Sequence, residues 1–323
     1  MRSSDDVRHP ARRALLLRAS LGLAGLPGLP ARAADPARAI AVIYPDLGEP
    51  FRSVFSTIIE GVEDRLRGRV ASFAAGNNAT PADFAEEIRR KEIKVLIGLG
   101  RSGMRVAAGL ASDLGVVVGC VVSVQENEVR GFPVHTLAPD PALLLQRLRK
   151  LMPAVKRVHV IYDPRLNAWL IRLARDAARA EGMELLAHEA VDQAAALRLY
   201  AQVLATADPP RDALWLAQDS TTVDDNAVLP LVLKEGWNRG LAVFSSNVSH
   251  VKRGALFSLY PDNLELGRSL ASAALRALGT PRPPPGVQPL RETRAAVNTR
   301  TAAHLGLDIQ SRLPTFDLVF PAP

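Results

Sequence analysis

Residues 94–122 read KVLIGLGRSGMRVAAGLASDLGVVVGCVV. An apolar, β-branched run over 94–99 is followed by an amphipathic stretch over 102–113 and by a second apolar run over 116–122. A strand, a helix and a strand in this order form a βαβ unit, in which the two strands lie parallel and the helix covers one face of their sheet. The stretch therefore predicts an α/β fold built on a parallel sheet.

The same alternation extends in both directions along the 323-residue chain. Strands are expected at 39–44, 70–74, 94–99, 116–122, 157–162, 184–190, 213–217, 241–245 and 255–259. Helices are expected at 51–67, 81–91, 102–113, 141–152, 167–181, 192–206, 226–236 and 263–278, before a final short strand-helix segment. This rhythm places helices on both faces of parallel sheets.

The alternation is interrupted after a basic helix that ends at Met152-Pro153. A break there divides the units into two sets, and a chain of this length usually forms more than one core. The expected fold class is α/β, with two doubly wound parallel-sheet lobes joined by a hinge; one large sheet is the alternative. Residues 38–152 with about 262–323 are assigned to lobe 1 and residues 153–261 to lobe 2.

Composition excludes several classes of protein. Hydrophobic residues make up 48% of the chain and charged residues 23%, values typical of a folded globular protein. No apolar stretch reaches the roughly 20 residues of a membrane-spanning helix, so direct membrane insertion of the mature chain is not expected. A nucleic-acid surface needs a basic stripe with aromatic residues, whereas aromatics are only 5% here and charges of both signs are mixed. No nucleic-acid partner is expected.

Residues 1–34 have the layout of an export signal. Basic residues 8–13 precede a short apolar core at 19–29, and Ala31-Arg32-Ala33 supplies a small-x-small cleavage pattern. A periplasmic protein, cleaved near residue 33 or 34, is therefore expected; an N-terminal arm on a membrane surface is the alternative. Arg12-Arg13 leaves open whether export follows the general or the twin-arginine route.

Cysteine and histidine usage argues against redox and metal chemistry. Cys120 is the only cysteine, so the chain can form no internal disulfide, and its apolar surroundings predict a buried thiol. The six histidines show no paired ligand spacing. No metal and no cofactor are expected.

Ligands of open parallel sheets gather at the carboxyl ends of the strands. The loops that follow the expected strands supply these candidate ligand-binding residues: Tyr44, Gly100, Arg101, Ser102, Ser123, Tyr162, Asn167, Asp219, Ser246 and Tyr260. Free N–H groups after Gly100, with Ser102, suit an anionic group at a helix N-terminus. Arg101 offers a bidentate clamp for a carboxylate, Asp219 a partner for an ammonium group, and the tyrosines flat walls.

Two other interpretations of the glycine loop are open. Gly98 to Gly103 matches G-x-G-x-x-G, the dinucleotide-binding pattern, with Glu126 as a ribose-binding acid, and predicts a nucleotide-dependent enzyme. The same loop nearly matches the hydrolase pattern G-x-S-x-G around Ser102, although Met104 replaces the second glycine. No spacing singles out His304 or any acid as the partner of such a serine.

Three further stretches resemble the tryptophan-type ABC transporter substrate-binding proteins. Residues 151–164 (LMPAVKRVHVIYDP), 254–268 (GALFSLYPDNLELGR) and 297–307 (VNTRTAAHLGL) are similar, in order and spacing, to motifs of that family. The resemblance covers roughly residues 38–310. It implies the type I periplasmic binding fold, a small solute that is often an aromatic amino acid, and a ligand-facing aspartate at Asp219. The chain departs from the family at 100–103 and at Pro261, both at the expected binding cleft.

These observations together predict a non-enzymatic solute-binding protein, monomeric in the periplasm. Its ligand is expected to be a small molecule, an amino acid or a related carboxylate, and its partner an inner-membrane ABC permease. A sensory receptor without a permease and a nucleotide-dependent enzyme are the alternatives.

Overall fold

The computed structural model describes residues 35–321, with gaps at 113, 126–127, 130 and 280–284. The expected signal peptide and Glu126 lie outside the described residues. Within them the strands form two sheets with helices on both faces, which confirms the predicted α/β class with two lobes.

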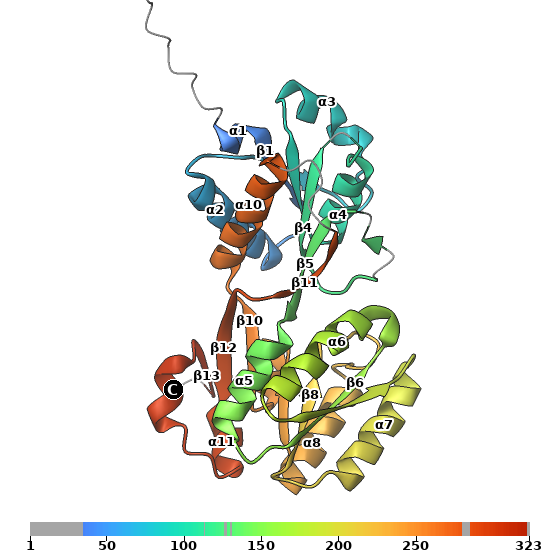
Figure 1. Cartoon of the computed structure of the whole chain (residues 1–323), viewed down its shortest axis with the longest axis vertical. Coiled ribbons are helices and arrows are strands. Elements are labelled where there is room, and N and C mark those ends of the chain that lie inside the picture. Colours follow the sequence, from blue (N-terminus) through green and yellow to red (C-terminus); the bar gives the residue numbers. More distant parts are fainter. Residues whose placement is uncertain (1–34, 113, 126–127, 130, 280–284, 322–323) are drawn as a thin grey trace, which may run out of the picture. The chain divides into compact units, whose positions relative to one another are not determined.

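The first sheet has six described strands in the order β11-β5-β4-β3-β1-β2, all parallel. They are β1 (Ile40–Pro45), β2 (Ala71–Ala75), β3 (Val95–Leu99), β4 (Gly115–Val121), β5 (Pro133–Pro139) and β11 (Gly286–Leu290). The helices of this lobe are α1 (Pro36–Ala39), α2 (Phe51–Leu66), α3 (Ala82–Arg90), α4 (Gly100–Gly109) and α10 (Asn263–Gly279). α2 and α10 bury one face of the sheet, and α3 and α4 bury the other (Figure 1).

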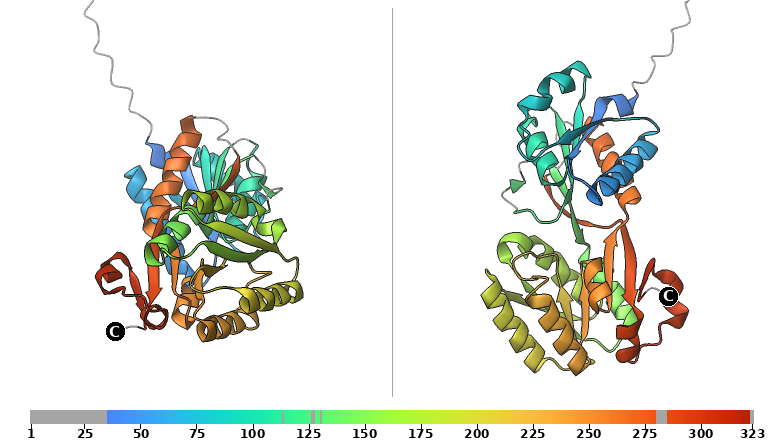
Figure 2. Two further views of the ribbon diagram at one scale, coloured as in Figure 1. Left: turned by 60° about the horizontal axis from the view of Figure 1, so that its bottom comes forward. Right: turned by 180° about the vertical axis from the view of Figure 1, so that it is seen from behind.

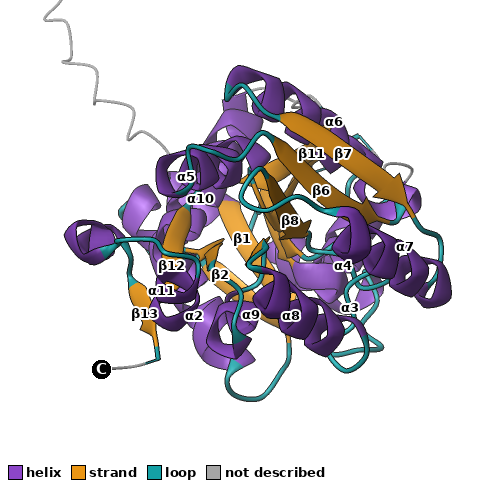
Figure 3. Ribbon diagram, turned by 90° about the horizontal axis from the view of Figure 1, so that it is seen from below, coloured by secondary structure: helices purple, strands orange, loops and turns teal. Residues whose placement is uncertain are grey.

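The second sheet has seven described strands in the order β13-β12-β10-β9-β8-β6-β7. They are β6 (Arg157–Tyr162), β7 (Glu184–Glu189), β8 (Asp212–Leu216), β9 (Ala242–Ser245), β10 (Phe257–Pro261), β12 (Thr293–Asn298) and β13 (Leu318–Phe320). The only antiparallel pairing described within it joins β10 to β12. Its helices are α5 (Pro141–Leu151), α6 (Pro164–Ala180), α7 (Gln193–Thr206), α8 (Val228–Arg239), α9 (Val248–Arg253), α11 (Thr299–His304) and the 3₁₀ helix η2 (Gln310–Thr315). Figure 3 shows its strands between α6 on one side and α7 and α8 on the other.

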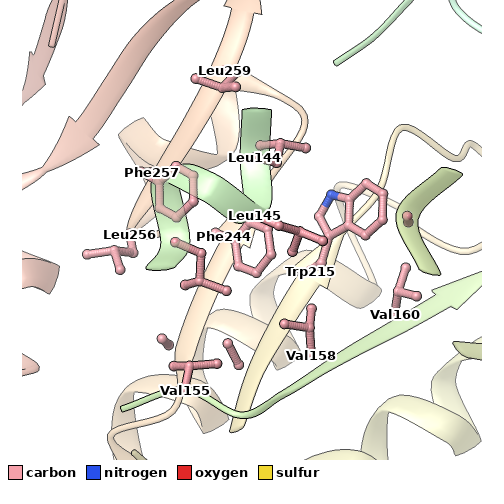
Figure 4. Packing of buried hydrophobic residues seen from close by; sticks show 14 of the residues in the cluster. Leu144, Leu145, Val155, Val158, Val160, Trp215, Phe244, Leu256, Phe257 and Leu259 are labelled. Carbon is pink, nitrogen blue, oxygen red and sulfur yellow. The ribbon is translucent and has the colours of Figure 1, made fainter. Parts of the chain in front are cut away.

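A row of aromatic side chains forms the centre of the second lobe. The rings of Trp215 and Phe244 are stacked with centroids 6.4 Å apart, and Phe257 continues the row at 5.1 Å from Phe244. The three residues come from the neighbouring strands β8, β9 and β10, and α5 covers them with Leu144 and Leu145 (Figure 4). Fully buried aromatic and leucine side chains each stabilise the fold by about 2 kcal/mol.

Two glycines bring helices of the first lobe into direct backbone contact. A Cβ on Gly61 would lie 2.1 Å from the carbonyl oxygen of Leu264, and one on Gly267 would lie 2.1 Å from that of Ile58. α2 and α10 therefore cross at a pair of residues without side chains, side by side in Figures 1 and 2. Gly267, the second glycine of the 254–268 motif, has this packing role.

Cys120 is buried as expected, and its burial raises the pKa of the thiol to about 12. It lies where the register between β4 and β5 shifts, with a positive φ of 60°. The neighbouring Gly119 lies close to α10, since a Cβ there would lie 2.6 Å from the side chain of Leu270.

Some elements of the structure were not predicted because their prolines are not typical of strands. β5 begins and ends with Pro133 and Pro139, and the edge strand β11 contains Pro289, a residue that cannot donate a ladder hydrogen bond. The helix expected at 167–181 begins at Pro164 because Asp163 caps it and proline suits the first turn. The short elements β13 and α9 were also missed.

The assignment of the last segment to lobe 1 was wrong for part of it. α10 and β11 do belong to the first lobe, but β12 and β13 pair with β10 in the second sheet. Their apolar alternation fits an edge of either sheet, so the sequence alone did not separate the two. α5, expected in lobe 1, contributes its buried leucines to the core of the second sheet instead.

The described chain passes between the two sheets at 139–141, 261–263 and 290–293. These crossings are hydrogen-bonded to one another. The amide of Asp140 donates to the carbonyl of Leu290 at 2.8 Å, and the amide of Asp262 donates to that of Glu292 at 2.9 Å. The Arg294 side chain also donates to the Asp262 carboxylate at 2.8 Å. Three segments far apart in the sequence thus form one connected ribbon.

Candidate functional site

In the first lobe, close backbone packing positions the loop after β3. A Cβ on Gly98 would lie 2.7 Å from the carbonyl oxygen of Gly103, and one on Gly103 would lie 2.5 Å from that of Ile43. Gly100 has φ +62° and lies against Pro45 of β1. Packing and backbone conformation account for all three glycines of the G-x-G-x-x-G pattern, so the pattern needs no nucleotide to explain it.

The first turn of α4 leaves polar groups available. Its N-cap residue, Leu99, offers no side-chain acceptor to the free N–H groups of the helix. Within the described residues, the Ser102 hydroxyl has no hydrogen-bond partner either. The N–H groups and this hydroxyl lie at the carboxyl end of β3, where an anionic group would be well placed.

Arg101 is already paired. Its guanidinium donates to both carboxylate oxygens of Glu128, at 3.0 and 3.1 Å, and to the carbonyl oxygen of Ser123 at 2.8 Å. These bonds join the loops after β3 and β4. The side chain of Arg101 is 56% exposed, so the paired guanidinium still faces solvent.

The loop after β1 carries groups that the sequence analysis did not single out. Asp46 is exposed, and its carboxylate has no partner among the described residues. Leu47 and Phe51 are 38% and 56% exposed, and Val122, after β4, is 47% exposed. Tyr44 is half-buried, with its ring 6.2 Å from that of Phe55. The position of Asp46, directly after a strand, was the signal that could have identified it.

In the second lobe, a hydrogen-bond network holds the loop after β8. Asp219 is 5% exposed, and its Oδ1 accepts from the amides of Thr221 and Thr222 at 2.9 and 3.0 Å. Its Oδ2 accepts from the amide of Asp163 at 2.7 Å and from the side chain of Asn167 at 2.9 Å. Four donors inside the protein therefore occupy this carboxylate, which ties the β8 loop to the start of α6.

Asp163 extends this network and caps α6. Its carboxylate accepts from the backbone and side chain of Arg165 and from the hydroxyl of Thr221 at 3.0 Å. Burial by itself raises the pKa of Asp163, but the bonds from Arg165 and Thr221 outweigh it and hold that pKa below its usual value. Arg165 is 59% exposed and also donates to the carbonyl of Val191, so a cation faces solvent at this edge of the sheet.

Tyr162 and Tyr260 were expected to form flat walls of the binding cleft, but neither is freely exposed. Tyr162 is 3% exposed within the core, and its hydroxyl donates to Glu189 at 2.9 Å. Burial and this hydrogen bond raise the pKa of Tyr162. Tyr260 is half-buried in β10 opposite Arg294, beside the crossings, and burial raises its pKa as well.

A Ser-His-Asp chain links the end of β9, α9 and the segment before α8. The Ser245 hydroxyl lies 2.8 Å from Nδ1 of His250, and Nε2 of His250 lies 3.0 Å from Asp225. Ser245 has no exposed surface and accepts from the amide of Asn247, so it is not placed to attack a substrate. The chain instead joins the β9 loop to the segment before α8. Next to it, the buried hydroxyl of Ser246 accepts from the Trp215 indole at 3.0 Å.

The expected site residues thus form two groups, one at the strand ends of each sheet. Tyr44, Gly100, Arg101, Ser102 and Ser123 belong to the first lobe. In the second lobe, Tyr162 ends β6 and Asn167 lies near the start of α6. Asp219 and Ser246 follow β8 and β9, and Tyr260 lies on β10. Arg165 and Asp46 are added by the structure. His304, considered as a base for Ser102, stacks on Trp237 of the second lobe instead.

The described residues show neither a metal cluster nor a membrane-spanning helix. No group of three or more histidine, cysteine, aspartate or glutamate side chains there is arranged to hold a metal ion. No helix in the described ranges is both long enough and apolar enough to span a membrane.

Two α/β sheets linked by three chain crossings, with polar loops at the carboxyl ends of their strands, define a two-lobed protein of the type I periplasmic-binding class. The chain belongs to the ABC transporter substrate binding protein family, whose sequence profile matches residues 60–315. That family implies a small-molecule ligand and a transporter partner, and its members are typically extracytoplasmic. No curated protein sequence is significantly similar to the chain.

Solved structures share the fold at low sequence identity. An ABC domain from Streptococcus pneumoniae in complex with L-Trp is 18% identical over 87% of this chain and 100% of its own, with a TM-score of 0.52. A ligand-free, open substrate-binding protein with adhesive properties from Clostridium difficile is 15% identical over 87% and 99%, with a TM-score of 0.62. A conserved domain protein from Vibrio cholerae is 17% identical over 87% and 99%, with a TM-score of 0.53.

Proposed function

We propose that this protein is a non-enzymatic periplasmic receptor that captures a small amphiphilic solute, an α-amino acid with an apolar side chain, for an ABC importer. One observation carries the choice of solute. Four of the seven large hydrophobic side chains exposed on the described surface follow the carboxyl ends of parallel strands: Leu47, Phe51, Val122 and Val191; the other three, Leu173, Trp237 and Leu318, lie on α6, α8 and β13. Exposed apolar side chains at the strand ends, where ligands of parallel sheets bind, suit a solute with an apolar body.

The first lobe offers both halves of an amino-acid head group. The N–H groups at the start of α4, with Ser102, would bind the α-carboxylate, and Asp46 would bind the α-ammonium. These groups are neighbours because Gly100 packs against Pro45, the residue before Asp46. The L-Trp complex of the pneumococcal structure is consistent with such a solute.

Asp219 takes a different role in this proposal from the one expected of it. Its four internal hydrogen bonds leave it to organise the β8 loop, while Asp46 has a free carboxylate. Arg165 and the loops after β6, β8 and β9 would close over the solute from the second lobe.

Calorimetric titration with the L-amino acids tests the proposal. An apolar or aromatic L-amino acid should bind, and Asp46→Asn should weaken its binding by at least about tenfold, the effect of losing one charge-assisted contact. The matched variant Asp83→Asn removes one carboxylate of the same lobe at the exposed start of α3 and should leave affinity unchanged. Absence of binding by every amino acid would overturn the choice of solute, and equal losses in the two variants would overturn the role of Asp46.

Export is the second part of the proposal. Residues 1–34 have the layout of a signal peptide, and α1 begins at Pro36, directly after the expected cleavage site. The mature protein recovered from the periplasm should begin near Ala34 or Asp35 by N-terminal sequencing. An intact Met1 on protein from the cytoplasmic fraction would contradict a periplasmic receptor.

A further inference from the structure

The second lobe has a groove of about 470 Å³ away from the residues proposed to hold the solute. Its lining comes from α5, from β10 and β12, and from η2 near the C-terminus: Leu143, Gln146, Arg147, Lys150, Leu151, Leu259, Thr293, Arg312 and Thr315. A volume of this size falls within the range of small-molecule sites, roughly 300–1,000 Å³.

The charge of the groove has one sign. Arg147, Lys150 and Arg312 line it, and no carboxylate does. None of the three side chains forms an ion pair within the described residues. Other arginines of the same lobe are neutralised by a partner, as Arg157 is by Asp212 at 2.6 Å. Like charges that share one groove repel each other, so an anion bound among them is strongly favoured.

Two of the cations are held in place before any ligand arrives. The Arg147 guanidinium lies 4.9 Å from the centre of the Phe316 ring and donates to the hydroxyl of Thr315 at 3.0 Å. Arg312 donates to the carbonyl oxygen of Lys150 at 2.6 Å. Burial lowers the pKa of Arg147, and the nearby Asp317 raises it; the Asp317 carboxylate itself accepts from the amide of Ala295. The ammonium of Lys150 has no partner and completes the set.

The rest of the lining indicates what else the ligand carries. Leu143, Leu151 and Leu259 supply apolar surface, while Gln146 and Thr293 supply an amide and a hydroxyl that the described structure leaves without side-chain partners. We propose that this groove is a second binding site, which takes a small organic anion with a phosphate or carboxylate group and an apolar part. The anion would contact Lys150 and the free edges of the two guanidiniums, and the apolar part would lie on the leucines.

The groove also lies beside the chain crossings. α5 begins just after the crossing at 139–141, β10 ends at the crossing at 261–263, and β12 begins at the crossing at 290–293. Each of these elements contributes to the lining. A ligand in the groove would therefore contact an element next to each of the three connections.

Calorimetric titration of the purified protein with phenyl phosphate, inorganic phosphate and phenol tests the proposal. Phenyl phosphate should bind saturably and more tightly than inorganic phosphate, and phenol should not bind. Lys150→Gln and Gln146→Glu break no hydrogen bond of the described structure, and each should weaken phenyl phosphate binding by about tenfold. The double variant Arg198→Gln, Lys234→Gln removes two exposed cations from α7 and α8 and should leave binding unchanged.

Hydrogen exchange locates the site. Phenyl phosphate should slow amide exchange in α5 and in residues 310–315, and leave α7 and α8 unaffected. Lack of saturable binding by phenyl phosphate, an equal loss in the α7–α8 double variant, or protection confined to the strand-end loops would each overturn the proposal. The last of these outcomes would assign the anion to the proposed solute site instead.

Discussion

In the first lobe, main chain packed directly on main chain positions the loops after β1 and β3, whereas in the second lobe side-chain hydrogen bonds position the loops after β6, β8 and β9. Gly103 contacts the backbone of β1 with no room for a Cβ. Asp219, by contrast, accepts four hydrogen bonds, two from its own loop and two from the start of α6. Backbone packing leaves the polar groups of the first-lobe loops free to bind a ligand. In the second lobe, the polar side chains are hydrogen-bonded within the protein.

This difference shows which polar side chains are available to bind a ligand. A buried carboxylate that already accepts several internal bonds is needed for the loop's shape, and an exposed, unpartnered one is available for recognition. The first lobe should therefore bind the charged head group of the solute, while the second-lobe loops should close over the solute without rearranging. Four measurements test this contrast.

The largest effect is expected from Gly103→Ala. The new Cβ would lie 2.5 Å from the carbonyl oxygen of Ile43 and 3.1 Å from Gly98, both backbone atoms that cannot move aside. We expect the free energy of unfolding to fall by about 3 kcal/mol in urea titrations. Gly76→Ala, at a glycine with nothing within 4 Å, should change it by no more than about 0.5 kcal/mol. Equal effects at the two glycines would refute the role of close packing.

Asp219→Asn should be next in size. An amide in place of the carboxylate turns one acceptor into a donor that faces donors, and leaves buried N–H groups without a partner. We expect a loss of about 2 kcal/mol in the stability of the unliganded protein, measured by urea unfolding. Asp46→Asn should be neutral in the same assay. A stable Asp219→Asn protein that has lost only ligand affinity would instead place Asp219 among the ligand contacts.

A smaller effect is expected from the buried histidine of the second lobe. Burial lowers the pKa of His250 below its ordinary value of 6.5, with Asp225 opposing this shift. The unfolded chain then takes up the proton more readily, so the folded state loses stability as pH falls below that value. Between about pH 7.5 and about pH 5.5, His250→Gln should lose less stability than the wild type. An unchanged slope in His250→Gln would contradict the assignment.

The smallest effect is expected from Arg101→Gln. Its ion pair with Glu128 is largely exposed, and exposed pairs contribute at most about 1 kcal/mol. Thermal unfolding of the unliganded protein should change little. A large loss of stability would show that the links from Arg101 to Glu128 and Ser123 are needed for the loops of the first lobe.

Much of the fold was predictable because its signals are local. The apolar runs and amphipathic stretches located most strands and helices, and the 254–268 and 297–307 motifs identified the family. The structure shows that these motifs largely serve folding: Gly267 allows α2 and α10 to cross, and Asn298 caps α11. The pairing of β12 with β10 was not predictable, because it depends on contacts between segments distant in the sequence.

The sequence predicted which loops form the candidate site, but not which of their side chains are free to bind a ligand. Position after a strand indicated Gly100, Ser102 and Asp219, but not whether each side chain would be free. That depends on partners from other segments, such as Asn167 for Asp219. A bulky side chain at Gly103 would disrupt the fold, so a substitution there cannot test whether this loop binds the ligand.

The burial of Cys120 makes lobe motion measurable. It is the only thiol of the chain, and with a pKa of about 12 it is protected from labelling reagents at neutral pH. Cysteines introduced at exposed positions, one on α3 and one on α7, would be the only reactive thiols and would take a pair of fluorophores. Energy transfer between them would then report each opening and closing of single molecules as candidate solutes are added.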